Sequence, residues 1–328
     1  MNPSTLSQSI KTRSAELGFD MVGISKAEKL EKEARYLEKW LREGRHGKME
    51  WIENHFDKRV DPHLLVEGAK SVISVIHNYY PEPQHQQPEG APKISSYAWG
   101  EDYHKVLKRK LYTLFEHIQT LVGAEVAGRV FVDSAPVMDK AWATRAGLGW
   151  IGKHTNLITP RRGSYFFIGE IILDLVLDYD GPIRDYCGTC TRCIDACPTE
   201  ALSPYEIDAS KCISYLTIEL REEIPAEFGD KLKDWAYGCD ICQEVCPWNR
   251  FSQAHSGQAF KPLDFMLDFG AAEWEELDER TFKKLTRHSA MSRVKWEKMK
   301  GNIKWVRENT ARADHSNIKE GGNGRELS

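Results

Sequence analysis

Eight cysteines are the residues of this 328-residue chain with the most evident capacity for chemistry. The first four read Cys187-x2-Cys190-x2-Cys193-x3-Cys197, and a proline follows the last one. This spacing is typical of bacterial ferredoxins, in which three closely spaced thiolates bind one [4Fe–4S] cluster and the fourth binds a second cluster. The run therefore predicts iron–sulfur chemistry, which is the transfer of single electrons.

A second cysteine run supplies the ligands that the first run lacks. It reads Cys239-x2-Cys242-x3-Cys246-Pro247, and the one remaining cysteine is Cys212. Two [4Fe–4S] clusters need eight thiolates, and the chain has eight cysteines. Because the last cysteine of each run binds the cluster of the other run, each cluster takes ligands from both runs. The first predicted cluster is bound by Cys187, Cys190, Cys193 and Cys246, and the second by Cys197, Cys212, Cys239 and Cys242.

Zinc and disulfide bonds are the alternatives for these cysteines. Zinc ribbons use two separated C-x2-C pairs, whereas here three cysteines follow one another at x2 spacings before Cys-Pro. Disulfides are rare in a reducing compartment. The first residues, MNPSTLSQSIKTRS, have no apolar signal region and no twin-arginine signal, so we expect a cytoplasmic protein. The absence of an apolar run of about 18 residues excludes a membrane-spanning helix.

The segments before the cysteines must position whatever accepts the electrons. Their hydrophobic periodicity predicts helices over 5–16, 28–44 and 104–122, and strands over 71–76, 129–133 and 164–178. Helices and strands alternate up to about residue 178, which indicates an α/β or α+β domain. The stretch before the cysteines is long enough to form a domain that holds an electron acceptor.

A further helix is expected over 136–146. Ser134 can cap it, Pro136 suits its first turn, and Gly147 lies just past its end. The following stretch, GLGWIGKHT (147–155), imitates two nucleotide-binding motifs in the wrong context. A dinucleotide fingerprint follows a strand rather than a helix, and a P-loop has Ser or Thr where His154 stands. The glycines suit either a close approach to a large flat ligand or an ordinary turn.

Composition divides the chain into four expected parts. They are an N-terminal domain (1–178), a two-cluster module (179–252), a helical basic segment (253–312) and a polar tail expected to be disordered (313–328). The net charge is −4, but residues 280–312 hold eleven Lys or Arg against two Glu, a local net of +9. Such a segment suits a polyanion such as RNA, and a solvated helical face is the alternative.

Four segments together resemble the epoxyqueuosine reductase family. They are YAWGEDYHKVL (97–107), VDSAPVMDKAWATRAGLGWIGKHTNLI (132–158), the first cysteine run, and CDICQEVCPWN (239–249). The resemblance implies an N-terminal cobalamin-binding domain similar to the reductive dehalogenase core, a ferredoxin-like module with two [4Fe–4S] clusters, and a short C-terminal helical segment. It implies that electrons pass through the clusters to cobalamin. The epoxide of epoxyqueuosine at the tRNA wobble position is then reduced to queuosine, the last step of queuosine biosynthesis.

The resemblance also implies the residues of the site. Asp133 would be the proton donor, and a plain helix cap is the alternative role for it. His154 departs from the asparagine that is usual in the family. Contacts with cobalamin are expected from Arg59, Tyr97, Asp133, Lys153, His154, Thr155, Ser214 and Tyr215, with packing or a surface salt bridge as the alternative.

The implied partners are a tRNA carrying epoxyqueuosine in its anticodon and an external low-potential electron donor. The basic segment could contact the tRNA backbone, and Trp296 and Trp305 could stack on a base or instead anchor an amphipathic helix. We expect a monomer. Two other functions stay open at this point, a cytoplasmic corrinoid reductive dehalogenase and a non-catalytic ferredoxin-type electron-transfer protein.

Overall fold

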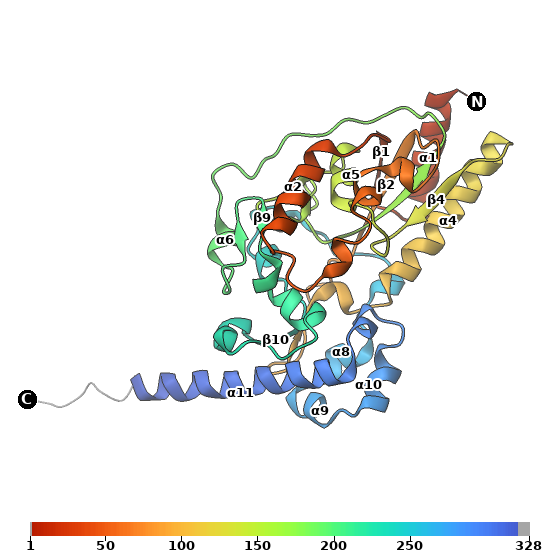
Figure 1. Ribbon diagram of the computed structural model, residues 1–328. Helices are drawn as coiled ribbons and strands as arrows, with labels where there is room; N and C mark the ends of the chain where they lie inside the picture. Colours follow the sequence, from red (N-terminus) through yellow and green to blue (C-terminus); the bar gives the residue numbers. More distant parts are fainter. Residues whose placement is uncertain (1, 321–328) are drawn as a thin grey trace, which may run out of the picture.

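The computed structural model describes residues 2–320 and is built on one four-stranded sheet (Figure 1). The strand order is β1 (Met21–Lys26), β2 (Ser71–Asn78), β7 (Phe166–Leu173) and β4 (Gly128–Phe131). Each neighbouring pair is antiparallel, and β2 pairs with β7 along eight residues, from Ser71 opposite Leu173 to Asn78 opposite Phe166. The sequence allowed an α/β or an α+β domain. An antiparallel sheet covered by helices belongs to the α+β class.

Helices cover both faces of this sheet. One face packs against α1 (Pro3–Glu16) and α4 (Tyr103–Val122), which lie side by side in Figure 1. The other face packs against α2 (Glu31–Arg42), α3 (Phe56–Val60) and α5 (Asp139–Arg145). Because both faces are covered, β2 is buried over seven of its eight residues. The predicted apolar stripe of α4 is confirmed, with Leu107, Leu111, Leu114 and Ile118 fully buried.

The expected helix over 136–146 is wrong at its start. The helix α5 begins at Asp139, and Ser134 does not cap it, since the Ser134 hydroxyl accepts from Lys108 Nζ at 2.9 Å. The physical reason is a three-residue turn in which the Val137 N–H donates to the Ala135 carbonyl at 2.7 Å. The buried Val137 side chain holds this turn against the sheet. Residues 133–138 therefore form a loop, which we call the Asp133 loop.

The cysteine-containing part is joined to the first domain by backbone pairing. Its short elements are α6 (Arg192–Asp195), β8 (Leu202–Ser203), β9 (Glu206–Ile207), β10 (Trp235–Tyr237) and α7 (Ile241–Glu244). The strand β10 pairs with β3 (Lys93–Ile94) of the first domain. A hairpin of β5 (Trp150–Ile151) and β6 (Leu157–Ile158) completes the strands. The remaining helical turns are Glu50–Ile52, Pro62–Leu64, Ser96–Ala98, Ala209–Lys211, Tyr215–Glu219, Ala226–Leu232, Pro247–Phe251, Gln258–Phe260 and Ala290–Arg293.

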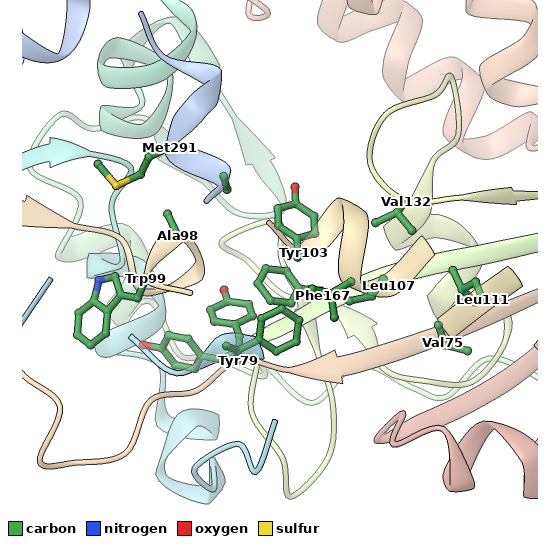
Figure 2. Packing of buried hydrophobic residues seen from close by; sticks show 14 of the residues in the cluster. Val75, Tyr79, Ala98, Trp99, Tyr103, Leu107, Leu111, Val132, Phe167 and Met291 are labelled. Atoms are coloured by element: carbon green, nitrogen blue, oxygen red, sulfur yellow. The ribbon is translucent and has the colours of Figure 1, made fainter. Parts of the chain in front are cut away.

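The C-terminal helices share the core of the first domain. They are α8 (Asp264–Asp268), α9 (Ala271–Glu276), α10 (Glu279–Thr286) and α11 (Trp296–Glu320). Met291, which precedes α11, lies near Ala98 and Trp99 of the first domain in Figure 2 and belongs to the same buried cluster. The segment is therefore packed as part of one core.

The tail expected to be disordered from residue 313 is helical up to Glu320, since α11 continues to that residue. Glycines 321 and 322 are the first residues after it with low helix propensity. Residues 321–328 of the expected tail lie outside the described residues. None of the described helices has the length and apolar composition that crossing a bilayer requires.

Candidate active site and cluster ligands

A cavity of about 890 Å³ lies where the first domain meets residues 209–219. This volume is near the upper end of the range for small-molecule sites, about 300–1,000 Å³. The predicted site residues that line it are Arg59, Tyr97, Asp133, Ser214 and Tyr215, and Cys212 lines it as well. Residues that are far apart in the sequence, and that were selected there by resemblance, therefore surround one space.

Asp133 lies just past the end of β4 and directs its side chain, which is 60% exposed, into the cavity. Its backbone has φ +46, a left-handed conformation that non-glycine residues seldom adopt and that is common at functional sites. Tyr103 donates a hydrogen bond from Oη to Asp133 Oδ2. Burial, followed by the charge of Asp133, raises the pKa of Tyr103 well above its usual value, so Tyr103 stays a donor.

The hydroxyl of Tyr103 is presented by a rigid ring. The ring stacks on Phe167 with centroids 4.3 Å apart and planes 3° apart. Figure 2 shows this ring within the apolar cluster, with the hydroxyl directed out of it. The start of α4 thus fixes the direction from which Asp133 receives its hydrogen bond.

His104 was not singled out in the sequence, although it lies in the segment YAWGEDYHKVL. Its Nδ1 is 2.8 Å from Asp102 Oδ1, and its Nε2 is 3.8 Å from Asp133 Oδ2. Asp102 also caps α4 by accepting from the His104 N–H at 3.1 Å. Burial would raise the pKa of Asp102, but its contacts with His104 outweigh burial and lower it. The sequence signal that could have identified His104 as a site residue is an N-capping Asp followed by His two residues later.

Thr155 contributes to the cavity indirectly. It has φ +65, and its carbonyl accepts from Lys140 Nζ at 2.9 Å, while Asn156 Oδ1 accepts from the same atom at 3.1 Å. The Lys140 side chain lines the cavity and keeps contact with solvent. The protein around its ammonium group lowers the pKa of Lys140.

Lys153 and His154, which were expected to contact cobalamin, are not among the residues that line the large cavity. They line a separate cavity of about 200 Å³ with cysteines of the first predicted cluster. Lys153 Nζ donates to the carbonyls of Gly188 at 2.7 Å and Cys190 at 2.9 Å. The β5–β6 hairpin turns these side chains away because it packs on the cysteine-containing part.

His154 is neutral at this position. It is only 2% exposed, and its Nδ1 accepts from the Asn156 N–H at 3.1 Å. Burial lowers its pKa to about 4. An uncharged side chain of this kind serves the packing of the hairpin.

The structure groups the cysteines across the two runs. Those lining the smaller cavity are Cys187, Cys190, Cys193 and Cys246, which is the set assigned to the first cluster. In the second set, burial raises the pKa of Cys242, and the charges of Cys212, Asp240, Cys193 and Cys197 raise it further. All eight cysteines lie in the described part of the chain and are free of disulfide bonds.

Two family models match the chain. The one described as Epoxyqueuosine reductase QueG, DUF1730 matches residues 59–134, and the one described as 4Fe-4S double cluster binding domain matches residues 186–249. The second match covers all eight cysteines, so the chain carries a domain for two [4Fe–4S] clusters, as the spacing predicts.

Known relatives match over almost the whole chain. An epoxyqueuosine reductase from Leadbetterella byssophila is 58% identical over 92% of this chain and 98% of the relative. One from Escherichia coli is 41% identical over 92% of this chain and 79% of the relative.

Solved structures agree with this assignment. An epoxyqueuosine reductase with an epoxyqueuosine-modified tRNA-Tyr stem loop matches with a TM-score of 0.83 and 30% identity, over 93% of this chain and 81% of that chain. The Bacillus subtilis enzyme, with its aspartate catalytic loop swung out of the active site, matches with a TM-score of 0.85 and 28% identity, over 93% and 82%. The fold, the cysteine module and these identities show that the chain belongs to the epoxyqueuosine reductase family.

Proposed function

We propose that this protein reduces the epoxide of epoxyqueuosine in tRNA to queuosine, with cobalamin bound in the large cavity. The observation that carries the proposal is the arrangement of this cavity. Asp133, a candidate proton donor, and Cys212, a candidate ligand of the second cluster, line the same cavity. A cofactor in this cavity would meet both an electron source and an acid.

The cavity residues fit a corrin ring with its amide side chains. Tyr97, Tyr103 and Tyr237 provide flat apolar surface along the wall. Arg59 lines the cavity, and its guanidinium could donate to an amide or phosphate of the cofactor. Ser214 offers a further hydroxyl just past Cys212. We propose Arg59, Tyr97, Ser214 and Tyr215 as the cobalamin contacts.

Removing the epoxide oxygen as water consumes two electrons and two protons. Cobalamin would supply the electrons at the substrate. Asp133 would donate a proton to the epoxide oxygen, and Tyr103 would hold the carboxyl in the required direction through its hydrogen bond. His104, oriented by Asp102, has Nε2 3.8 Å from Asp133 Oδ2 and would return a proton to it through a bridging water.

Electrons would enter at the first cluster. Its four candidate ligands surround the smaller cavity, next to Lys153 and away from the large cavity. We propose that an external low-potential donor reduces the protein there, and that the Cys212 side of the module delivers electrons to the large cavity.

The tRNA would approach the basic segment. Its described ion pairs include Arg293 with Glu219, at 2.6 Å, and Arg307 with Glu275, at 3.1 Å. Within residues 280–309, the Lys and Arg side chains that are exposed and form no described ion pair are proposed as phosphate contacts; they are Arg280, Lys284, Arg287, Lys295 and Lys300.

The tryptophans favour the anchoring role over base stacking. Trp296 packs on Phe282 with centroids 5.4 Å apart, and Trp305 Nε1 donates to the Gly229 carbonyl at 3.2 Å. A tRNA substrate fits a cytoplasmic location, and we retain this location and a monomeric state as part of the proposal.

The test is an assay on protein purified and reconstituted without oxygen, with iron, sulfide and cobalamin supplied. It uses tRNA bearing epoxyqueuosine, and the nucleosides are measured by mass spectrometry after digestion. We expect conversion to queuosine, together with bound iron and cobalt. Iron without cobalt would favour an electron-transfer protein, and turnover of halogenated organics instead of tRNA would favour a dehalogenase.

Asp133→Asn tests the proton donor. Loss of general acid catalysis typically lowers a rate by about 10²–10⁴-fold. We expect this loss of turnover with unchanged iron, cobalt and tRNA affinity. Turnover at the wild-type rate would remove Asp133 from its assigned role.

A further inference from the structure

A pair of carboxyl groups lies beneath the Asp133 loop and is not used by the chemistry described above. Glu170 is in the middle of β7, opposite Ser74 on β2 and Phe131 on β4, and is 0% exposed. Asp139, the first residue of α5, lines the large cavity. Both carboxyl oxygens of Glu170 and Oδ1 of Asp139 are buried without a donor among the described residues.

The two carboxyl groups lie within hydrogen-bond reach of each other. This contact is favourable only if they share a proton, since no other donor among the described residues serves either oxygen of Glu170 or Oδ1 of Asp139. Two ionised carboxylates would repel and would both lack a donor, whereas one protonated carboxyl can donate to the other. Burial, followed by the charge of Asp139, raises the pKa of Glu170 well above its usual value. Burial raises the pKa of Asp139 to about 6, and the hydrogen bond with Glu170 opposes this rise. Glu170 is therefore the donor and Asp139 the acceptor at neutral pH.

The position of this pair connects it with the Asp133 loop. Asp139 directly follows the loop, and Phe131, two residues before Asp133, pairs with Glu170 in the sheet. One side chain of β7 thus lies beside both ends of the loop. The other polar anchors of the loop lie at its start, where Tyr103 donates to Asp133 and Lys108 donates to Ser134.

We propose that Glu170 is a positioning residue, whose hydrogen bond to Asp139 holds the Asp133 loop against the sheet with Asp133 in the cavity. This deepens the proposed function and rests on it for the role of Asp133. The proton shared by Glu170 and Asp139 is lost to or taken from solvent, and no group is oxidised or reduced. Loss of the shared proton leaves two buried negative charges beside the loop and favours its release.

Other charged and titratable groups face the pair from the surrounding elements. They are Asp133 from the loop, Lys140 from α5, Arg59 from α3 and Tyr103 from α4. Lys140 gives its hydrogen bonds to Thr155 and Asn156, so it does not replace the donor that Asp139 receives from Glu170. An experiment at alkaline pH must distinguish the effect of Glu170 losing its proton from the effect of Lys140 losing its proton. Substitution of Glu170 alone makes this distinction.

The test is hydrogen–deuterium exchange of residues 133–138 in the full-length, cluster-reconstituted protein at pH 7 and pH 9.5, corrected for intrinsic exchange. Wild-type exchange should rise about tenfold or more at the higher pH, the size expected for losing a hydrogen bond to a charged group. Glu170→Gln should abolish this rise, because its amide donates to Asp139 at either pH. Glu170→Ala should exchange rapidly already at pH 7.

Asp174→Asn is the matched control, since Asp174 follows β7 and also has a buried oxygen without a donor, but does not contact Asp139. It should behave as wild type. An equal alkaline rise in wild type and Glu170→Gln would overturn the proposal, as would a protected loop in Glu170→Ala. Exchange is measured without turnover, so a protein that fails to reduce epoxyqueuosine but shows the Glu170 effect would refute the function and keep the positioning role.

Discussion

Trp150 offers a direct test of how the protein sets the reduction potential of the first cluster. Its indole Nε1 donates to Cys187 Sγ at 3.4 Å, and its ring is 2% exposed. A hydrogen bond to a cluster sulfur stabilises the more negative, reduced state more than the oxidised state. Trp150→Phe keeps an aromatic ring but removes the donor, so the potential of this cluster should become more negative.

The size of the change follows from the strength of the bond. A hydrogen bond to a charged group is worth about 1.5–3 kcal/mol. If about a third of this differs between the redox states, the shift is about 0.5–1 kcal/mol. Since about 1.4 kcal/mol corresponds to about 59 mV for one electron, we expect a decrease of roughly 20–40 mV.

The assay is an anaerobic redox titration followed by electron paramagnetic resonance. One of the two cluster midpoints should move, and the other should stay where it is in wild type. Trp248→Phe is the matched control, because Trp248 packs on Trp150 with centroids 4.9 Å apart and has no described hydrogen bond to sulfur. A midpoint in Trp150→Phe that is unchanged or less negative would refute the reasoning, and so would an equal shift in Trp248→Phe.

Three further predictions concern stability and tRNA binding. Gly47→Ala should destabilise the protein by roughly 2–4 kcal/mol in denaturant unfolding, because φ is +60 and the new Cβ would lie 2.6 Å from the Tyr215 ring at the cavity wall. Gly44→Ala, with φ +67 and no neighbour within 4 Å, should cost only about 1 kcal/mol. Burial lowers the pKa of Lys298 to about 8, so Lys298→Met should raise the free energy of unfolding at pH 7 by roughly 1–3 kcal/mol. This gain should fade as pH rises from 8 to 10.5, where only the unfolded wild-type chain still binds the proton. Finally, tRNA affinity measured by filter binding should fall steeply with added salt if the segment 280–312 contacts phosphates.

Each of these predictions has a result that contradicts it. Equal losses in Gly47→Ala and Gly44→Ala would mean that Tyr215 moves aside without cost. A gain from Lys298→Met that persists above pH 10.5 would assign the effect to packing instead of charge. A tRNA affinity that does not change with salt would exclude the basic segment as the main contact.

Local chemistry could be predicted from the sequence. The cysteine runs are such a case, because neighbouring ligands must bind one cluster and their spacing along the chain is set by that geometry. The apolar face of α4 is another, since a period of 3.6 residues is a property of the helix itself. The sequence also argued against nucleotide binding by residues 147–155, because the expected helix before them does not suit a dinucleotide fingerprint and His154 replaces the Ser or Thr of a P-loop.

Packing between distant segments could not be predicted in this way. Ser134 and Pro136 favour a helix start locally, but burial of Val137 against the sheet produces the Asp133 loop instead. Lys153 and His154 share a motif with the predicted cavity residues, but the β5–β6 hairpin turns them toward the first-cluster cysteines.

The amino-acid sequence by itself determined which residues can bind iron–sulfur clusters and which helices have an apolar face, because both depend on neighbours along the chain. Only the tertiary structure decided that the sheet is antiparallel and that Glu170 meets Asp139 beneath the loop. Those contacts join strands and helices about thirty or more residues apart. Their free energy depends on burial and on shared protons, and neither can be predicted from a local sequence pattern.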